Sequence, residues 1–221
     1  MEVAQVDRLI EQMNAEPLAF VVHVGDIGSS ARACSDDWLL ARKEQFSHIR
    51  HPLVLVPGDN EWTDCREQSQ RLKAWRKLFC FPANGLDLSF QKGEFCEHVR
   101  WEAGGTLFVA LNVPGSNNNV RRPDEYAPRM EAVFAWIDQS AALARQRGLR
   151  LALLMQADPF VTAPRDGYGT LREKLRELGA RQSTVLIHGD THLYRDDEPL
   201  PGVRRIEVWG SPVVDWLRVA F

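Results

Sequence analysis

Short apolar runs that end in polar turns are the feature that most constrains how this chain can fold. The clearest example is LVLVPGDNEWTDC, residues 53–65, where five apolar residues precede Gly58 and a group of acidic and amide side chains. An unbroken apolar run closed by Pro-Gly is typical of a strand buried on both faces. Such strands occur mostly in parallel sheets, which bind ligands beyond their carboxyl ends. The sequence therefore predicts an α/β fold.

Apolar runs of this kind alternate along the chain with helical patterns. This alternation favours a central, partly parallel sheet with helices packed outside it, in one domain that spans residues 1–221. Because the chain begins on a helix, where a βα-type domain usually begins on a strand, we expect a first strand to be missing upstream. The expected strands are 18–24, 53–56, 106–112, 151–155, 184–187, 203–209 and 215–221, with short ones around Leu88 and Val99, and the expected helices are 2–14, 36–49, 66–80, 126–147 and 169–180.

Composition narrows the class of protein but not its compartment. The net charge of -3 and the pI near 6.1 give no indication of a nucleic-acid partner, and no apolar run reaches the roughly 18 residues of a membrane span. The expected localisation is cytoplasmic as written, or periplasmic or secreted if a signal-bearing N-terminus precedes it. The four cysteines form no C-x-x-C pair, so disulfides and free thiols both stay open, as does the oligomeric state.

Each of the five buried strands ends in side chains that can bind a cation or donate an amide hydrogen. Asp and Asn are common in turns for local reasons, but five such ends on one edge of one sheet predict a shared polar cleft. Carboxylates, amides and imidazoles in such a cleft can hold two divalent cations. The residues are Asp26 after the first strand, Asp59, Asn60 and Glu61 after the second, Asn112 and Asn117 to Asn119 after the third, Gln156 and Asp158 after the fourth, and His188, Asp190 and His192 after the fifth.

The order of these motifs resembles that of the calcineurin-like metallophosphoesterases, whose signature is D-x-H, G-D, G-N-H-[DE], a lone His, and G-H-x-H. Here 25–26 matches the second motif, 58–61 stands at the third and 189–192 at the last, so the resemblance covers about residues 18–192. A bacterial branch of this superfamily has a similar GDNEWTDC segment and HGD-x-H ending. The resemblance implies an α/β/β/α sandwich with mixed central sheets, and hydrolysis of a phosphomonoester or phosphodiester by a metal-bound hydroxide at a two-metal site.

The departures from this signature concern its imidazoles. The D-x-H motif is absent and would lie before residue 1. Asn60 stands where a His usually assists the leaving group, and an amide cannot donate a proton in that way at neutral pH. Gln156 stands near the lone His, and Asp190 replaces the first His of G-H-x-H, which leaves His192 as the imidazole ligand. An oxygen-rich set favours manganese or magnesium, with zinc, iron and calcium as alternatives.

These considerations assign a role to each candidate residue. The loop GSNNNVRR is the expected contact with substrate, because amides and arginines suit phosphate oxygens; the substrate would be a phosphorylated small molecule or nucleotide-like. His23 is expected in the core, and His48, His51 and His98 at the surface or in loops. An alternative is a degenerate, non-catalytic member that binds a ligand or partner in the same cleft. The candidates are Asp26, Asp59, Asn60, Gln156, Asp190 and His192 for metal, Asn60 and His188 for catalysis, and Asn117, Asn118 and Arg121 for substrate.

Overall fold

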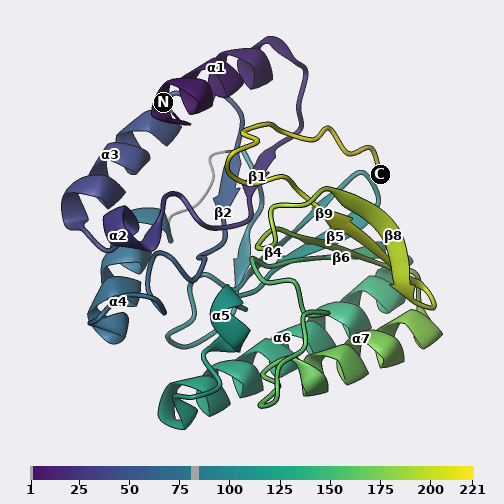
Figure 1. The fold of residues 1–221 in the computed structure, drawn as a ribbon. Helices are drawn as coiled ribbons and strands as arrows, with labels where there is room; N and C mark the ends of the chain where they lie inside the picture. The colour runs from purple at the N-terminus through teal and green to yellow at the C-terminus, as the bar shows by residue number, and fades with distance from the viewer. Residues whose placement is uncertain (1, 81–84) are drawn as a thin grey trace.

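The structure is a computed structural model that describes residues 2–80 and 85–221. A seven-stranded mixed sheet forms its largest part (Figure 1). Its four central strands β5, β6, β7 and β9 are parallel, and antiparallel strands complete both edges. The predicted α/β class is therefore confirmed. In spatial order the strands are β3 (Ser89–Phe90), β4 (Val99–Ala103), β5 (Thr106–Ala110), β6 (Arg150–Leu154), β7 (Thr184–His188), β9 (Val203–Glu207) and β8 (Arg195–Leu200).

The first two predicted strands form a sheet of their own. β1 (Val21–His23) and β2 (Leu53–Leu55) pair in parallel and do not join the seven-stranded sheet. The expectation of five strands on one edge of one sheet is therefore wrong. The physical reason lies in the side chains, because Val54 and Val56 pack against the face of the larger sheet instead of extending its edge. The sequence shows that these strands are buried but not which neighbour buries them.

Alternating side chains of the central strands build two cores, one on each face of the larger sheet. In β5, Leu107 and Val109 face helices α6 (Pro123–Arg147) and α7 (Gly169–Arg181), whereas Phe108 and Ala110 face the small β1–β2 sheet. This period of two is what a strand buried on both faces requires. The long α6 ends at Arg147, and its C-cap residue Gly148 has a left-handed φ of 66° that suits glycine.

A third core lies on the other side of the small sheet. There Ile10, Leu39 and Trp75 contact Leu55. These residues come from α1 (Glu2–Ala15), α3 (Asp36–Phe46) and α4 (Gln68–Phe79), which lie together on one side of the molecule (Figure 1). The order of layers is thus α6 and α7, the seven-stranded sheet, the β1–β2 sheet, and then α1, α3 and α4. Two shorter helices are α2 (Ser30–Ala33) and α5 (Gly115–Asn118).

The C-terminal part of the prediction is partly wrong. Strand β9 lies within the expected range 203–209, but its antiparallel partner is β8 and not 215–221, which forms no strand. The sequence of β8, RDDEPL, has no alternating apolar residues. This edge strand is held instead by cross-strand ion pairs of Arg204 with Asp196 and of Arg205 with Asp197. The apolar residues of 215–221 instead cover the cores from irregular backbone.

Three further features bear on the sequence predictions. The cysteines form two disulfides, Cys34–Cys65 and Cys80–Cys96. His98 lies in the loop before β4, one of the two predicted alternatives, but it is completely buried and not at the surface. A hydrogen bond of 2.6 Å between its Nδ1 and Gln91 Oε1 offsets part of the cost of burial. Among the described residues, no helix combines the length and apolarity that crossing a membrane requires. Residues 81–84, which follow the predicted helix 66–80, lie outside those described.

Candidate metal centre

Three carboxylates from both sheets converge on one amide group. The Nε2 atom of Gln156 lies 3.0 Å from Asp26 Oδ2, 3.0 Å from Asp59 Oδ1 and 3.3 Å from Asp190 Oδ1. Asp26 and Asp59 follow β1 and β2, whereas Gln156 and Asp190 follow β6 and β7. The carboxyl ends of the two sheets therefore meet here, and they bring together four of the predicted site residues, which we call the carboxylate cluster.

Burial and mutual repulsion disfavour the charged form of these carboxylates. Burial, together with the charges of Glu61 and Asp59, raises the pKa of Asp26 to about 10. Burial and the charge of Asp59 raise the pKa of Asp190 to about 6. Among the ion pairs of residues 2–80 and 85–221, no arginine or lysine pairs with Asp26, Asp59 or Asp190. Negative charge on the carboxylate cluster is therefore not compensated by a basic side chain within the described residues, and an added cation would compensate it.

Glu61 holds the backbone of the two turns from the small sheet. Its completely buried carboxylate accepts hydrogen bonds from the backbone N–H groups of Asp26 (3.1 Å), Ile27 (2.7 Å) and Gly58 (2.6 Å). Asp26 has a left-handed φ of 60°, which is costly for a residue with a Cβ and needs such support. Glu61 therefore orients the two turns that carry Asp26 and Asp59.

A strained turn brings Ser116 to the carboxylate cluster. Residues 116–119 are four consecutive non-glycine residues with φ between 48° and 56°, which costs roughly 1–2 kcal/mol for each residue. The buried side chains of Arg129 and Tyr168 bind this turn through Asn118. The Oγ atom of Ser116 lies 2.8 Å from both Asp59 Oδ2 and Asp64 Oδ1. The sequence prediction included Ser116 only as part of the loop GSNNNVRR and gave it no role of its own, because the direction of its side chain depends on a backbone conformation that apolar periodicity does not reveal.

Glycine at position 115 lets this turn approach the carboxylates. A Cβ atom added to Gly115 would lie 2.5 Å from Asp190 Oδ1 and 2.8 Å from Asp59 Oδ2. Both distances are shorter than any normal contact of a carbon with an oxygen. The Gly115 N–H also donates a hydrogen bond to Gln156 Oε1. The carboxylate cluster thus needs a residue without a side chain at this position.

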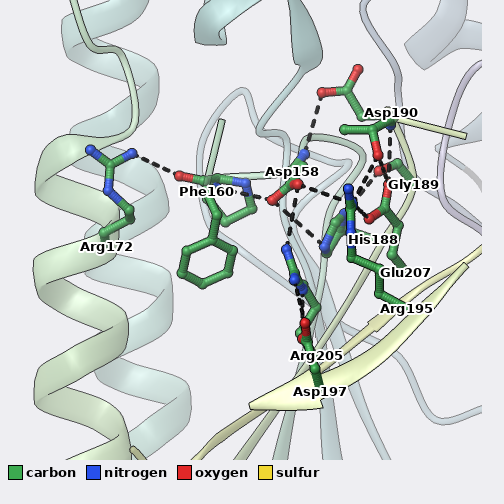
Figure 2. Close-up of polar contacts among 12 residues, drawn as sticks. Asp158, Phe160, Arg172, His188, Gly189, Asp190, Arg195, Asp197, Arg205 and Glu207 are labelled. Carbon is green, nitrogen blue, oxygen red and sulfur yellow. Dashed lines mark hydrogen bonds and ion pairs between the residues drawn. The ribbon is translucent and has the colours of Figure 1, made fainter. Parts of the chain in front are cut away.

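A second group of charged residues lies beside Asp190 of the carboxylate cluster (Figure 2). Asp158, His188 and Glu207 are buried, and one ligand atom of each lies within 4.8 Å of the others, so they could hold a metal ion. Positive side chains are already present here, because Arg195 forms ion pairs with both Asp158 and Glu207, and Arg205 lies 3.5 Å from Asp158. In this respect the second group differs from the carboxylate cluster.

Two contacts connect this second group to the turn that carries Asp190. The backbone N–H of Asp158 lies 3.3 Å from Asp190 Oδ2, as Figure 2 shows. Glu207 accepts hydrogen bonds from the backbone N–H (3.2 Å) and the hydroxyl of Thr191. His188, predicted to be catalytic, lies 2.8 Å from its neighbour's carbonyl oxygen through Nδ1, while its Nε2 lies 3.9 Å from Asp158 Oδ1. Burial lowers the pKa of His188.

The remaining predicted site residues lie around the carboxylate cluster or away from it. Asn60 contributes its backbone N–H, 3.3 Å from Asp26 Oδ1. His192 is exposed, with Nδ1 2.7 Å from the carbonyl oxygen of Ser211. Asn117 and Asn118 use both ends of their amides on nearby groups, chiefly the 165–167 segment, and Asn118 is completely buried. Arg121 is exposed.

Comparison of the sequence with protein-family profiles and with curated proteins found no match. The geometry of the carboxylate cluster and the resemblance of its motifs are therefore the basis for assigning a function.

Proposed function

We propose that the chain is a divergent member of the calcineurin-like metallophosphoesterases and hydrolyses phosphoesters with divalent cations. The observation that supports this best is the convergence of Asp26, Asp59 and Asp190, from both sheets, with no arginine or lysine paired to them within the described residues. Two sheets packed face to face between helices are also what the α/β/β/α sandwich of that family requires. We infer that this is the fold.

The residues of the carboxylate cluster fit a hard divalent cation. Their donor atoms are carboxylate oxygens, which suit magnesium and manganese better than soft metals. A divalent cation bound there would lower the pKa of a water molecule and offset the negative charge of a phosphoryl group. Asp26, Asp59 and Asp190 would hold it, and the resemblance implies a pair of such cations. His192 would need to turn inward to contribute its imidazole.

The other residues of the site would position the cation-binding carboxylates and bind the substrate. Glu61 fixes the turn of Asp26, and Ser116 fixes the outer oxygen of Asp59. Arg121 is exposed beside the 115–119 turn and is suited to a phosphate oxygen of a phosphorylated small molecule or nucleotide-like substrate. Among the described residues, the hydrogen bonds of the carboxylate cluster include no imidazole, so the leaving group would take its proton from water.

A second candidate is a non-catalytic protein that binds a phosphorylated ligand in the same place. The amide of Gln156 favours it, because its nitrogen already lies within hydrogen-bond distance of one oxygen of each of the three carboxylates. Both candidate functions require a bound cation, and only the first requires hydrolysis of the phosphoester.

Hydrolysis assays with a matched control variant distinguish the catalytic candidate from the non-catalytic one. Protein loaded with Mn²⁺ is incubated with p-nitrophenyl phosphate, a monoester, and bis(p-nitrophenyl) phosphate, a diester. We expect turnover of at least one, abolished by EDTA and lowered at least tenfold in Asp59→Asn, since changes around metal sites cost about 10–100-fold. Asp196→Asn, which affects an exposed ion pair with Arg204, is the control. Cation binding without turnover would support the second candidate, and absence of cation binding would contradict both.

A further inference from the structure

The amide nitrogen of Gln156 takes up the space between the three carboxylates. It lies within 3.3 Å of one oxygen from each of Asp26, Asp59 and Asp190. A side-chain amide has two hydrogens on nitrogen, so three acceptors share two donors. The carboxylate oxygens that face one another across the carboxylate cluster are therefore already engaged with a neutral donor.

The orientation of this amide is determined by the backbone. Gln156 Oε1 accepts the N–H of Gly115, so Nε2 must face the carboxylates. A rotation of the amide by 180° would direct its NH₂ group at the Gly115 N–H and its oxygen at three carboxylate oxygens. Both arrangements are repulsive. Gln156 consequently presents hydrogens, and not an oxygen ligand, to the carboxylate cluster.

The side chain of Gln156 has little room to withdraw. It is 1% exposed. Its Cγ lies so close to Gly25 that a Cβ atom added there would be 2.8 Å away. The backbone carbonyl of Gln156 accepts the N–H of Gly189 at 3.0 Å, which holds the turns after β6 and β7 together. The amide group is thus kept in place from several sides.

We propose that Gln156 sets the number of cations in the site, so that the chain binds one divalent cation and not two. This inference rests on the proposed function, because it concerns the same carboxylates. The amide nitrogen occupies the position from which a second cation would contact the three facing oxygens. The amide does not engage Asp26 Oδ1, Asp59 Oδ2 and Asp190 Oδ2, which accept hydrogen bonds from the Asn60 N–H, the Ser116 hydroxyl and the Asp158 N–H. The single cation would bind on this side of the carboxylates, in place of one or more of these hydrogen bonds.

The test is the stoichiometry of Mn²⁺ binding in the wild type and two variants. Gln156→Ala removes the amide, and Gln156→Glu keeps an acceptor for Gly115 while replacing the NH₂ group by an oxygen. Calorimetric titration should give one Mn²⁺ for the wild type and two for each variant. Paramagnetic resonance should show an isolated Mn²⁺ in the wild type and a spin-coupled pair in the variants. The control variant is Gln91→Ala, because Gln91 is a glutamine that forms hydrogen bonds with Ala132 and His98. It should bind one Mn²⁺, like the wild type.

Each result has a distinct meaning. Two coupled cations in the wild type would overturn the inference, as would a single cation in a variant that retains the wild-type circular dichroism spectrum. If Gln156→Ala fails to fold, the isosteric Gln156→Glu decides the question. No binding by any of the proteins would contradict the proposed function itself, whereas one cation in the wild type and two in the variants would support both proposals.

Discussion

At the scale of single residues, two buried glutamates have the same role, one in the turn after β2 and the other in β9. Glu61 accepts the backbone N–H of Asp26, and Glu207 accepts that of Thr191, next to Asp190. Both glutamates are completely buried, and both support residues with positive φ, 60° at Asp26 and 83° at Asp190. The strain at the carboxylate cluster is thus offset by the hydrogen bonds that these buried side chains accept.

Replacement of Gly115 by alanine should damage the carboxylate cluster directly. The new Cβ would collide with Asp190 and Asp59, and overpacking of this kind costs about 1–3 kcal/mol. We expect Gly115→Ala to lower both the free energy of unfolding and the affinity for Mn²⁺, measured by denaturant titration and calorimetry. Gly169→Ala is the matched control, since its Cβ would meet no atom closer than 3.6 Å at the start of α7. Unchanged Mn²⁺ affinity in Gly115→Ala would contradict this geometry.

His98 should make stability depend on pH. Burial lowers the pKa of this imidazole from about 6.5 to about 4. Between these values the unfolded chain binds a proton that the folded protein does not. The contribution of neutral His98 to the free energy of unfolding is therefore fully present above pH 6.5 and is lost as the pH falls toward 4. This pH-dependent contribution to the free energy of unfolding amounts to about 3 kcal/mol. His98→Asn keeps a donor near Gln91 but removes the titration, so its free energy of unfolding should vary less over this range. Equal pH profiles of the two proteins would refute the assignment.

At the scale of elements, pattern and packing explain which predictions hold. The strands buried on both faces, β5, β6 and β7, have unbroken apolar sequences, and their ranges agree with the prediction to within a residue or two at each end. Strand β8 was missed because its charged side chains pair with β9 across a sheet edge, an interaction between segments that no local pattern contains. Residues 215–221 have apolar alternation but cover the core without joining a sheet.

The disulfide Cys34–Cys65 should support the site as well as the fold. It joins the end of α2 to the segment that carries Asp59 and Asn60, and closing a loop of this separation, 31 residues, stabilises by about 3–4 kcal/mol. We expect the double variant Cys34→Ala/Cys65→Ala to lose stability and also Mn²⁺ affinity. The double variant Cys80→Ala/Cys96→Ala, which opens the other disulfide, should lose stability alone. Equal Mn²⁺ affinities in the two variants would argue against a role in the site.

At the scale of the whole molecule, the sequence identified the polar strand ends but not how the layers assemble. Asp26, Asp59, Gln156 and Asp190 could be selected because each follows an apolar strand, and the structure brings them together. Their surroundings could not be predicted in the same way. The direction of the Gln156 amide depends on Gly115, and the position of Ser116 depends on a left-handed turn held by Arg129, so both follow from tertiary contacts between distant segments.

The arrangement of the carboxylate cluster across two sheets has a consequence for the order of folding. Gln156 and Asp26 are separated by 130 residues, so the contact between them closes a long loop, and contacts of this kind are costly before the surrounding structure exists. If the cluster forms after the folding transition state, Mn²⁺ should slow unfolding and leave the refolding rate unchanged. Stopped-flow measurements with and without Mn²⁺ test this. A cation that accelerated refolding would mean that the two sheets dock early, before the helices complete the outer layers.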